Sequence, residues 1–109
     1  MAPLTPAVMH ILLSLAGGQR HGYAILKDVQ EQTNHRIRLG PGTLYGTLQR
    51  LMESGWVEET DGPGDEDERR RYYRLSRSGR DALKSEVDRL DALLRGAKAH
   101  GIVPRASRN

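Results

Sequence analysis

One stretch of the chain, residues 40–56, constrains the fold more than any other. It reads G-P-G-T-L-Y-G-T-L-Q-R-L-M-E-S-G-W. At about 100° per residue, its large apolar side chains fall on one side of a helix. This core-facing stripe consists of Leu44, Leu48, Leu51 and Met52. Gly40 suits the N-cap, Pro41 suits the first helical position and Gly55 supplies a stop, so the sequence predicts a helix that is bounded at both ends.

The opposite side of this predicted helix carries small and polar residues. They are Gly42, Thr43, Gly46, Gln49, Arg50 and Glu53, with Tyr45 beside the apolar stripe. Long solvated side chains usually cover an outer helix face, whereas glycine lets another molecule approach the backbone closely. We therefore expect one face of this helix to meet the core and the other to meet a large partner.

Length and composition limit the chain to one small domain. Its 109 residues suffice for a modest core but not for a second domain or a deep active site. There is no cysteine, which excludes disulfides, thiolate zinc sites and thiol redox sensing. No apolar run is long enough to span a membrane, and the sequence does not begin with a signal-peptide pattern. We therefore expect a cytoplasmic protein that does not enter a membrane.

The charged residues are unevenly distributed along the chain. The formal net charge is only +3, with 17 Lys and Arg against 14 Asp and Glu. Seven of the acids lie between Glu58 and Glu68, whereas residues 69–80 hold six arginines and no acid. This separation predicts a basic surface despite the small net charge.

Two helices are expected before the central one. Thr5 and Pro6 suit the N-cap and first position of a helix that ends near Ala16, and a second helix is expected over residues 21–33. The first helix is apolar nearly all round, so either the core of the protein or a partner subunit must cover its second side. Residues 36–39 alternate basic and apolar side chains, which favours a very short strand.

A hairpin and a long helix are expected after the central helix. Residues 56–60 and 70–75 are typical of strands around a turn-forming segment, and the strand at 36–39 would pair on their edge. Ser76 or Ser78 then caps a helix that ends near Arg95. Its apolar residues recur at the spacing of a coiled coil, which suits a dimer contact. They are Leu83, Val87, Leu90 and Leu94.

Together these elements predict a mainly α-helical fold with a small antiparallel β wing. Helix, helix, strand, helix and hairpin is the order of a winged helix-turn-helix domain. We predict this DNA-binding domain over residues 1–76, a dimerisation helix over residues 77–95 and a disordered tail over residues 96–109.

Four motifs add a resemblance to a known family. They are His21-Gly22-Tyr23, L-G-P-G-T-L-Y at residues 39–45, R-R-R-Y-Y-R-L at residues 69–75, and Gly79-Arg80. In this order and spacing, and over residues 4–94, they resemble the PadR family of bacterial transcriptional regulators. The resemblance implies a homodimeric winged-helix repressor whose third helix enters the major groove and whose hairpin touches the flanking minor groove. It also implies that a ligand releases some members from DNA.

The predicted DNA contacts follow from the chemistry of these segments. Gln49 can pair with adenine, Arg50 with guanine or a phosphate, and Thr43 with a base or backbone oxygen. The alternative is that Gln49 and Arg50 are merely solvated. The full set of expected DNA contacts is His21, Gly22, Tyr23, Pro41, Gly42, Thr43, Tyr45, Gly46, Gln49, Arg50, Arg69, Arg70, Arg71 and Tyr72.

Two of these groups have alternatives of their own. His21, Gly22 and Tyr23 begin a helix, where backbone N–H groups attract a phosphate, but Tyr23 can instead pack beneath the sheet. Arginines on a β-ribbon suit a narrow groove, although the acidic run at residues 65–68 can instead neutralise them. Tyr72 and Tyr73 are expected to face opposite ways.

Dimer and effector contacts complete the expected sites. The residues predicted at the dimer interface are Val8, Ile11, Leu12, Leu83, Val87, Leu90 and Leu94. Such a dimer would bind an inverted-repeat operator in double-stranded DNA. Trp56 either closes the core or lines a cavity between subunits for an aromatic or hydrophobic effector.

Other function classes have less support from the residues. The four histidines form no i, i+3 or i+4 pair, and there is no G-x-S-x-G motif. Gly17 and Gly22 have the separation of a P-loop, but Tyr23-Ala24 stands where Lys-Ser/Thr is needed. We therefore expect no enzyme, no metal site and no cofactor. A winged-helix module for protein interaction or sensing, without DNA binding, is the remaining alternative.

Overall fold

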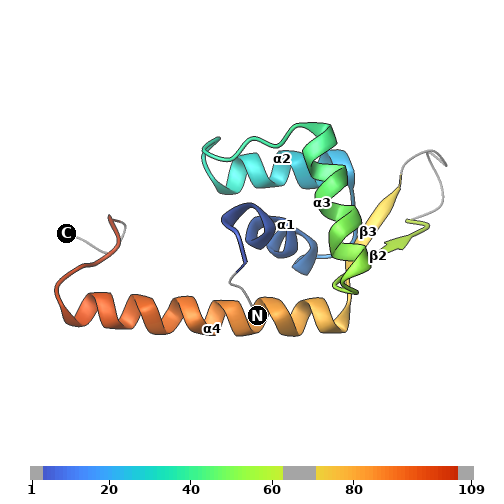
Figure 1. Ribbon diagram of the computed structural model, residues 1–109. Coiled ribbons are helices and arrows are strands. Elements are labelled where there is room, and N and C mark those ends of the chain that lie inside the picture. The colour runs from blue at the N-terminus through green and yellow to red at the C-terminus, as the bar shows by residue number, and fades with distance from the viewer. Residues whose placement is uncertain (1–3, 63–70, 106–109) are drawn as a thin grey trace.

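The computed structural model of the protein describes residues 4–62 and 71–105 (Figure 1). It is mainly helical, with one small antiparallel sheet. The elements in chain order are α1 (Pro6–Ala16), β1 (Arg20–His21), α2 (Gly22–Gln32), α3 (Pro41–Glu53), β2 (Val57–Thr60), β3 (Tyr72–Leu75) and α4 (Arg77–Ala99). The acidic run at residues 65–68, together with Arg69 and Arg70, lies outside the described residues.

Helices α1 and α4 begin where the sequence predicts them, because the residue before each one accepts a hydrogen bond from an open backbone amide. The Thr5 hydroxyl accepts from the N–H of Val8 at 3.2 Å before α1. The Ser76 hydroxyl accepts from the N–H of Gly79 at 3.0 Å before α4. At α3, Gly40 is the N-cap and Pro41 the first residue, and no side chain caps the helix.

The third strand of the sheet is not the predicted one. The strand order is β1-β3-β2, and Arg20 pairs with Tyr73 while His21 pairs with Tyr72. The prediction of a strand at residues 36–39 is wrong, because that segment connects α2 to α3 without joining the sheet. Its alternation has another cause, since Ile37 and the residue two positions on, Leu39, pack against the core.

The core is built around α1, which packs against α2, α4 and β3. The buried hydrophobic residues are Ile11, Leu12, Leu15, Ile25, Val29, Leu44, Leu48, Leu51, Val57, Tyr73 and Leu83. Ile11 and Leu12 are only 1% and 0% exposed. Their predicted place in a dimer interface is therefore wrong, since the chain's own core covers them. Leu83, which is also buried, contributes to this core from α4.

Helix α4 continues beyond the predicted end at Arg95 and finishes at Ala99. Gly96 lies inside the helix, where a glycine costs about 1 kcal/mol relative to alanine without ending it. The stop is Gly101, whose φ of 81° lets the N–H of Ile102 donate to the carbonyl of Ala97 at 2.9 Å. The predicted disordered tail is therefore wrong for residues 96–99.

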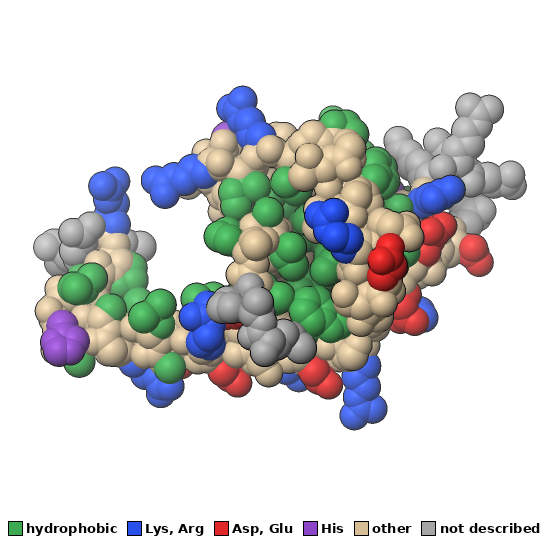
Figure 2. Space-filling model, in the orientation of Figure 1, with side chains coloured by type: hydrophobic (Ala, Val, Ile, Leu, Met, Phe, Trp, Pro, Cys, Tyr) green, Lys and Arg blue, Asp and Glu red, His purple; other side chains and the backbone are tan. Residues whose placement is uncertain are grey.

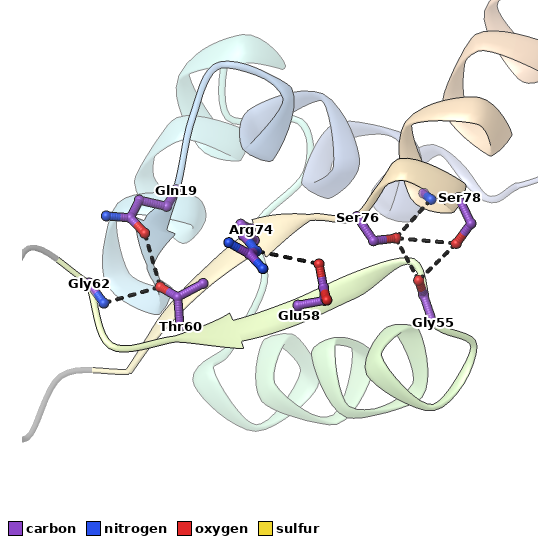
Figure 3. A network of polar contacts seen from close by, with 9 residues as sticks. Gln19, Gly55, Glu58, Thr60, Gly62, Arg74, Ser76 and Ser78 are labelled. Atoms are coloured by element: carbon purple, nitrogen blue, oxygen red, sulfur yellow. Dashed lines mark hydrogen bonds and ion pairs between the residues drawn. The ribbon is translucent and has the colours of Figure 1, made fainter.

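The first turn of α4 lies directly against the residues that lead from α3 into β2. The N–H of Ser76 donates to the carbonyl of Trp56 at 2.9 Å, and the hydroxyls of Ser76 and Ser78 donate to the carbonyl of Gly55 (Figure 3). Gly79 is buried at this contact. A Cβ at Gly79 would overlap the carbonyl oxygen of Trp56, so the position has no room for a larger residue.

Two glycines of α4 provide a matched test of this contact. Gly79→Ala should lower the free energy of unfolding by about 1–3 kcal/mol, because the added methyl group meets a fixed backbone carbonyl. Gly96→Ala has open space and should raise the free energy of unfolding by about 0.5–1 kcal/mol. Urea unfolding at one protein concentration would measure both. Equal effects of the two substitutions would contradict the assigned packing.

Candidate nucleic-acid interface

The outer face of α3 is exposed as the sequence predicts. The apolar stripe of Leu44, Leu48 and Leu51 points into the core. On the other side Gly46 is half-buried, and the exposed residues are Pro41, Gly42, Thr43, Tyr45, Gln49 and Arg50. Figure 1 shows α3 at the end of the molecule that also carries the β2–β3 hairpin. Helix α3 thus lies beside the β2–β3 hairpin, as in a winged helix-turn-helix domain.

Arg50 is held by a residue that the sequence analysis did not single out. The Thr47 hydroxyl donates to the carbonyl of Thr43 at 2.8 Å and accepts from Nη2 of Arg50 at 3.2 Å. Thr47 is buried, so it is a fixed support for the Arg50 side chain. The available sequence signal was the i, i+3 spacing of Thr47 and Arg50, which places them together on a helix.

Gly22 is buried between α2 and the Tyr45 side chain of α3 and is not exposed at the surface. A Cβ on Gly22 would overlap the hydroxyl of Tyr45 and lie 2.8 Å from its Cζ. The missing side chain lets the aromatic ring of α3 lie on the first turn of α2. The prediction of Gly22 as a DNA contact is therefore wrong, and the residue instead sets the packing of α2 against α3.

The start of α2 presents a tyrosine to solvent. Tyr23 is 62% exposed, so the alternative that it packs beneath the sheet is wrong. His21 is half-buried and caps the helix, because its Nδ1 accepts from the N–H of Ala24 at 3.1 Å. Tyr23 therefore stays available to a partner while His21 is fixed in place.

The hairpin has one buried and one outward-facing tyrosine, as predicted. Tyr73 is buried and Tyr72 is half-buried. Burial raises the pKa of the Tyr73 hydroxyl above its usual value, and the nearby Glu59 adds to the rise. Tyr73 is thus a neutral part of the core, whereas Tyr72 lies at the wing surface.

The described wing arginines pair with glutamates of the neighbouring strand. Nε of Arg74 lies 3.3 Å from Oε1 of Glu58 (Figure 3), and Nε of Arg71 lies 3.9 Å from Oε1 of Glu59. Arg71 and Arg74 are both well exposed. Exposed ion pairs of this kind contribute at most about 1 kcal/mol, so a phosphate can replace the glutamate.

The wing is also joined to the turn that precedes β1. The Thr60 hydroxyl donates to Oε1 of Gln19 at 3.0 Å and accepts from the N–H of Gly62 at 3.1 Å (Figure 3). These contacts connect the outer end of β2 to the segment between α1 and α2. The position of the wing relative to α2 is therefore fixed by side chains as well as by the strand ladder.

An apolar groove of about 460 Å³ runs between α1 and α4. Its lining is Leu4, Pro6, Met9, His10, Leu13, Leu83, Glu86, Val87, Arg89 and Leu90. Leu13, Val87 and Leu90 are 49%, 48% and 39% exposed, which is unusual for large apolar side chains in a helical core. Figure 2 shows hydrophobic side chains across the middle of this face and on the upper side of α4, with most charges on its lower side.

One buried carboxylate joins the two sides of the groove. Oε2 of Glu86 accepts from the N–H of Leu4 at 3.0 Å, and the same carboxylate pairs with Arg89. The hydrogen bond from the N–H of Leu4 lowers the pKa of Glu86, and Arg89 lowers it further. Trp56 does not line this groove but packs against the core, so the groove and not Trp56 is the apolar surface available here.

The described residues contain neither a metal-binding cluster nor a membrane-spanning helix. Across residues 4–62 and 71–105, no three His, Cys, Asp or Glu side chains gather as metal ligands would. Within the same ranges, no helix has the length and hydrophobicity needed to cross a membrane.

Comparison with known proteins identifies the family. Residues 11–85, which include α3 and the β2–β3 hairpin, match the transcriptional regulator PadR-like family. A transcriptional regulator of Mycobacterium tuberculosis is 36% identical over 95 residues, which cover 84% of this chain and 85% of that protein. A solved transcriptional regulator from Clostridium thermocellum has 26% identity and a TM-score of 0.70, covering 85% of this chain and 87% of that one.

A further relative is much longer than this chain. It is an uncharacterized 37.1 kDa protein of a Streptomyces fradiae transposon, 39% identical over 98 residues. The match covers 90% of this chain but only 26% of that protein, so this chain corresponds to about a quarter of its length. The family match spans more than half of the chain and agrees with the winged-helix architecture described above. The chain therefore belongs to the PadR-like family of transcriptional regulators.

Proposed function

We propose that this protein is a homodimeric repressor that binds a specific DNA sequence, with α3 in the major groove and the β2–β3 hairpin along the neighbouring minor groove. The observation that carries this proposal is the exposed small and polar face of α3 beside a basic hairpin. Family membership supports a regulator of transcription, and the geometry supports the way in which it would contact DNA. A cytoplasmic location is part of the same proposal, because such a regulator acts where the chromosome lies.

Base recognition is assigned to Gln49 and Arg50. Both are exposed on α3, and the side-chain amide of Gln49 makes no hydrogen bond within the described part of the chain, so it is available to adenine. Arg50 is pre-oriented by Thr47, which reduces the side-chain freedom lost when it contacts guanine or a phosphate. Thr43, at the start of the same face, is placed to contact the DNA backbone or a base edge.

Phosphate contacts are assigned to the wing. Arg71 is 70% exposed, and its pairing with Glu59 is long at 3.9 Å, so little is lost when a DNA phosphate takes the place of the carboxylate. Arg69 and Arg70 precede it in the sequence and belong to the same proposed contact region. Such contacts position the protein on DNA without reading its sequence.

A second copy of the chain is the occupant that we assign to the groove between α1 and α4. Its apolar residues, which include Leu13, Val87 and Leu90, would otherwise remain in water. Contact through this groove relates two winged domains by a two-fold axis. The operator is then an inverted repeat whose half-sites lie about 34–36 Å or a multiple of that distance apart.

Release by a small effector completes the proposal. The groove volume of about 460 Å³ is within the range of small-molecule sites, and its lining is mostly apolar. A hydrophobic molecule that enters the groove would compete with the partner subunit. The alternative, a protein-interaction module that does not bind DNA, leaves the bare face of α3 without a use.

Charging the groove tests the dimer. Val87→Glu together with Leu90→Glu should convert a dimer into a monomer, because two carboxylates would be buried against an apolar partner surface. Lys84→Glu is the control, since it changes the net charge equally but does not line the groove. Light scattering at micromolar concentration would measure the mass. A monomeric unmodified protein would sink the dimer proposal.

Replacing Gln49 tests sequence reading by α3. Gln49→Ala should cost about 1–3 kcal/mol on the cognate operator and relax the preference at one base pair, with little effect on random DNA. Binding titrations against operator variants, whose parent sequence comes from selection out of a random duplex pool, would measure this.

Arg71→Ala is the matched comparison on the wing. It should weaken cognate and random DNA alike and reduce the slope of log affinity against log salt by about 0.9 for the lost phosphate contact. The opposite pattern, with base preference changed by Arg71→Ala and not by Gln49→Ala, would mean that the wing is the reading element.

The single tryptophan provides a direct test of effector release. Because Trp56 packs near the junction of α3, the hairpin and α4, its fluorescence should change when a ligand alters the relation of these elements. A panel of aromatic compounds would be titrated while DNA affinity is followed in parallel. If neither the fluorescence nor the DNA affinity changes with any compound up to its solubility limit, release by aromatic effectors is contradicted.

A further inference from the structure

A tyrosine and a lysine form an exposed pair on α2, an element distinct from α3 and the hairpin. Tyr23 and Lys27 are one helical turn apart, and Nζ of Lys27 lies 5.7 Å from the centroid of the Tyr23 ring. Both side chains are exposed. The ring attracts the ammonium through a cation–π interaction, which holds the lysine over the tyrosine instead of leaving it free in solvent.

Lys27 is not neutralised within the described part of the chain. No ion pair within 4 Å joins it to a carboxylate there. The adjacent Asp28 is engaged elsewhere, because its Oδ2 lies 3.9 Å from Nε of Arg20 and accepts from Nε2 of Gln32 at 3.1 Å. The ammonium of Lys27 and the hydroxyl of Tyr23 therefore present a positive charge and a hydrogen-bond donor on one face of α2.

A row of rings connects this pair to the wing. The ring of His21 lies nearly parallel to that of Tyr23, with centroids 6.5 Å apart, and meets the ring of Tyr72 edge-on at 5.5 Å. His21 is fixed as the N-cap of α2 and as part of β1. Tyr72 is in turn backed by Gly62, where a Cβ would lie 2.6 Å from Cγ of the ring. The pair on α2 therefore has a defined position relative to the hairpin.

We propose that Tyr23 and Lys27 form a second phosphate-binding site on α2, which binds the DNA backbone separately from the hairpin. The contacting rings of Tyr72, His21 and Tyr23 fix the position of this site relative to the hairpin. This inference rests on the proposed DNA binding. A phosphate accepts a hydrogen bond from the Tyr23 hydroxyl and an ion pair from Lys27. Because the ring already orients the ammonium, less side-chain freedom is lost on binding.

Salt dependence measures this contact without knowledge of the operator. The unmodified protein and Lys27→Ala would be titrated against a short duplex of random sequence at several salt concentrations. Loss of one phosphate contact should reduce the slope of log affinity against log salt by about 0.9. The ratio of the unmodified protein's affinity to that of Lys27→Ala should therefore fall about threefold between 50 and 200 mM salt. Lys27→Arg keeps the charge and the cation–π contact and should retain the slope.

Two further variants separate the roles of the pair. Tyr23→Leu should weaken binding without changing the salt slope, because it removes the ring and the hydroxyl but no charge. Lys84→Ala, which removes the same charge from an exposed position on α4, should change neither affinity nor slope. Thermal unfolding of each variant should match the unmodified protein, because Tyr23, Lys27 and Lys84 are exposed.

The ring row is tested by combining substitutions. In a Tyr72→Leu background the effect of Lys27→Ala should be smaller than in the unmodified protein, which a double-mutant cycle would detect. Additive effects would overturn the positioning role of the rings. Equal salt slopes for Lys27→Ala and the unmodified protein would overturn the phosphate site alone. If the unmodified protein binds no duplex at all, the proposed function falls and this site falls with it.

Discussion

The burial of α1 is the constraint on which the rest of the structure depends. This helix has large apolar side chains on nearly every side, and the burial of each stabilises the fold by roughly 1.5–3 kcal/mol. Helix α2, strand β3 and helix α4 must therefore all pack against it. Arg20 adds a polar connection, because its Nε donates to the carbonyl of Ser14 at 3.0 Å. Helix α3, the hairpin and the groove take their relative positions from this shared support.

The proposed DNA surface combines elements that are far apart in the sequence. Helix α3 supplies the side chains for base edges, the hairpin supplies arginines, and the start of α2 supplies an exposed tyrosine and lysine. Gly22 allows Tyr45 to join α2 and α3, and His21 joins α2 to the sheet. The arginines are balanced by glutamates of β2 rather than left as bare charge. A chain with a small net charge can thus present local basic groups. In the proposed complex, a DNA phosphate would replace the glutamate that each arginine contacts in the free protein.

The parts of the fold that depend on local signals could be predicted from the sequence. Thr5, Gly40 and Ser76 mark helix starts because capping acts within three or four residues. The third strand could not be predicted in this way, because pairing of His21 with Tyr72 is a long-range contact that no local pattern specifies. Basic and apolar residues do alternate at residues 36–39, where the sequence wrongly predicts a strand. The alternation arises because Ile37 and Leu39 pack against the core.

The same distinction explains the site residues. The exposure of Gln49 and Arg50 could be predicted because the helical period separates buried from exposed positions. The sequence could not tell which side of the uniformly apolar α1 would meet the core, so Ile11 and Leu12 were misassigned to a dimer interface. Gly22 was likewise misassigned as a DNA contact, because only the folded chain places Tyr45 above it. The contact of Lys27 with the Tyr23 ring could not be predicted from a motif, because it depends on how the two side chains pack on α2.

The fixed start of α4 has a geometric consequence for the dimer that we propose. Gly79 anchors the helix against the carbonyl of Trp56, and the groove begins one turn later at Leu83. A single residue inserted between them would lengthen the helix by only about 1.5 Å but would rotate the groove by about 100° around the axis. In the proposed dimer, the angular phase of α4 would thus determine where the second winged domain points, much more strongly than the length of α4 does. In the proposed dimer, a variant that recognises half-sites at a new separation would need α4 changed by whole turns, or a rebuilt contact with Trp56.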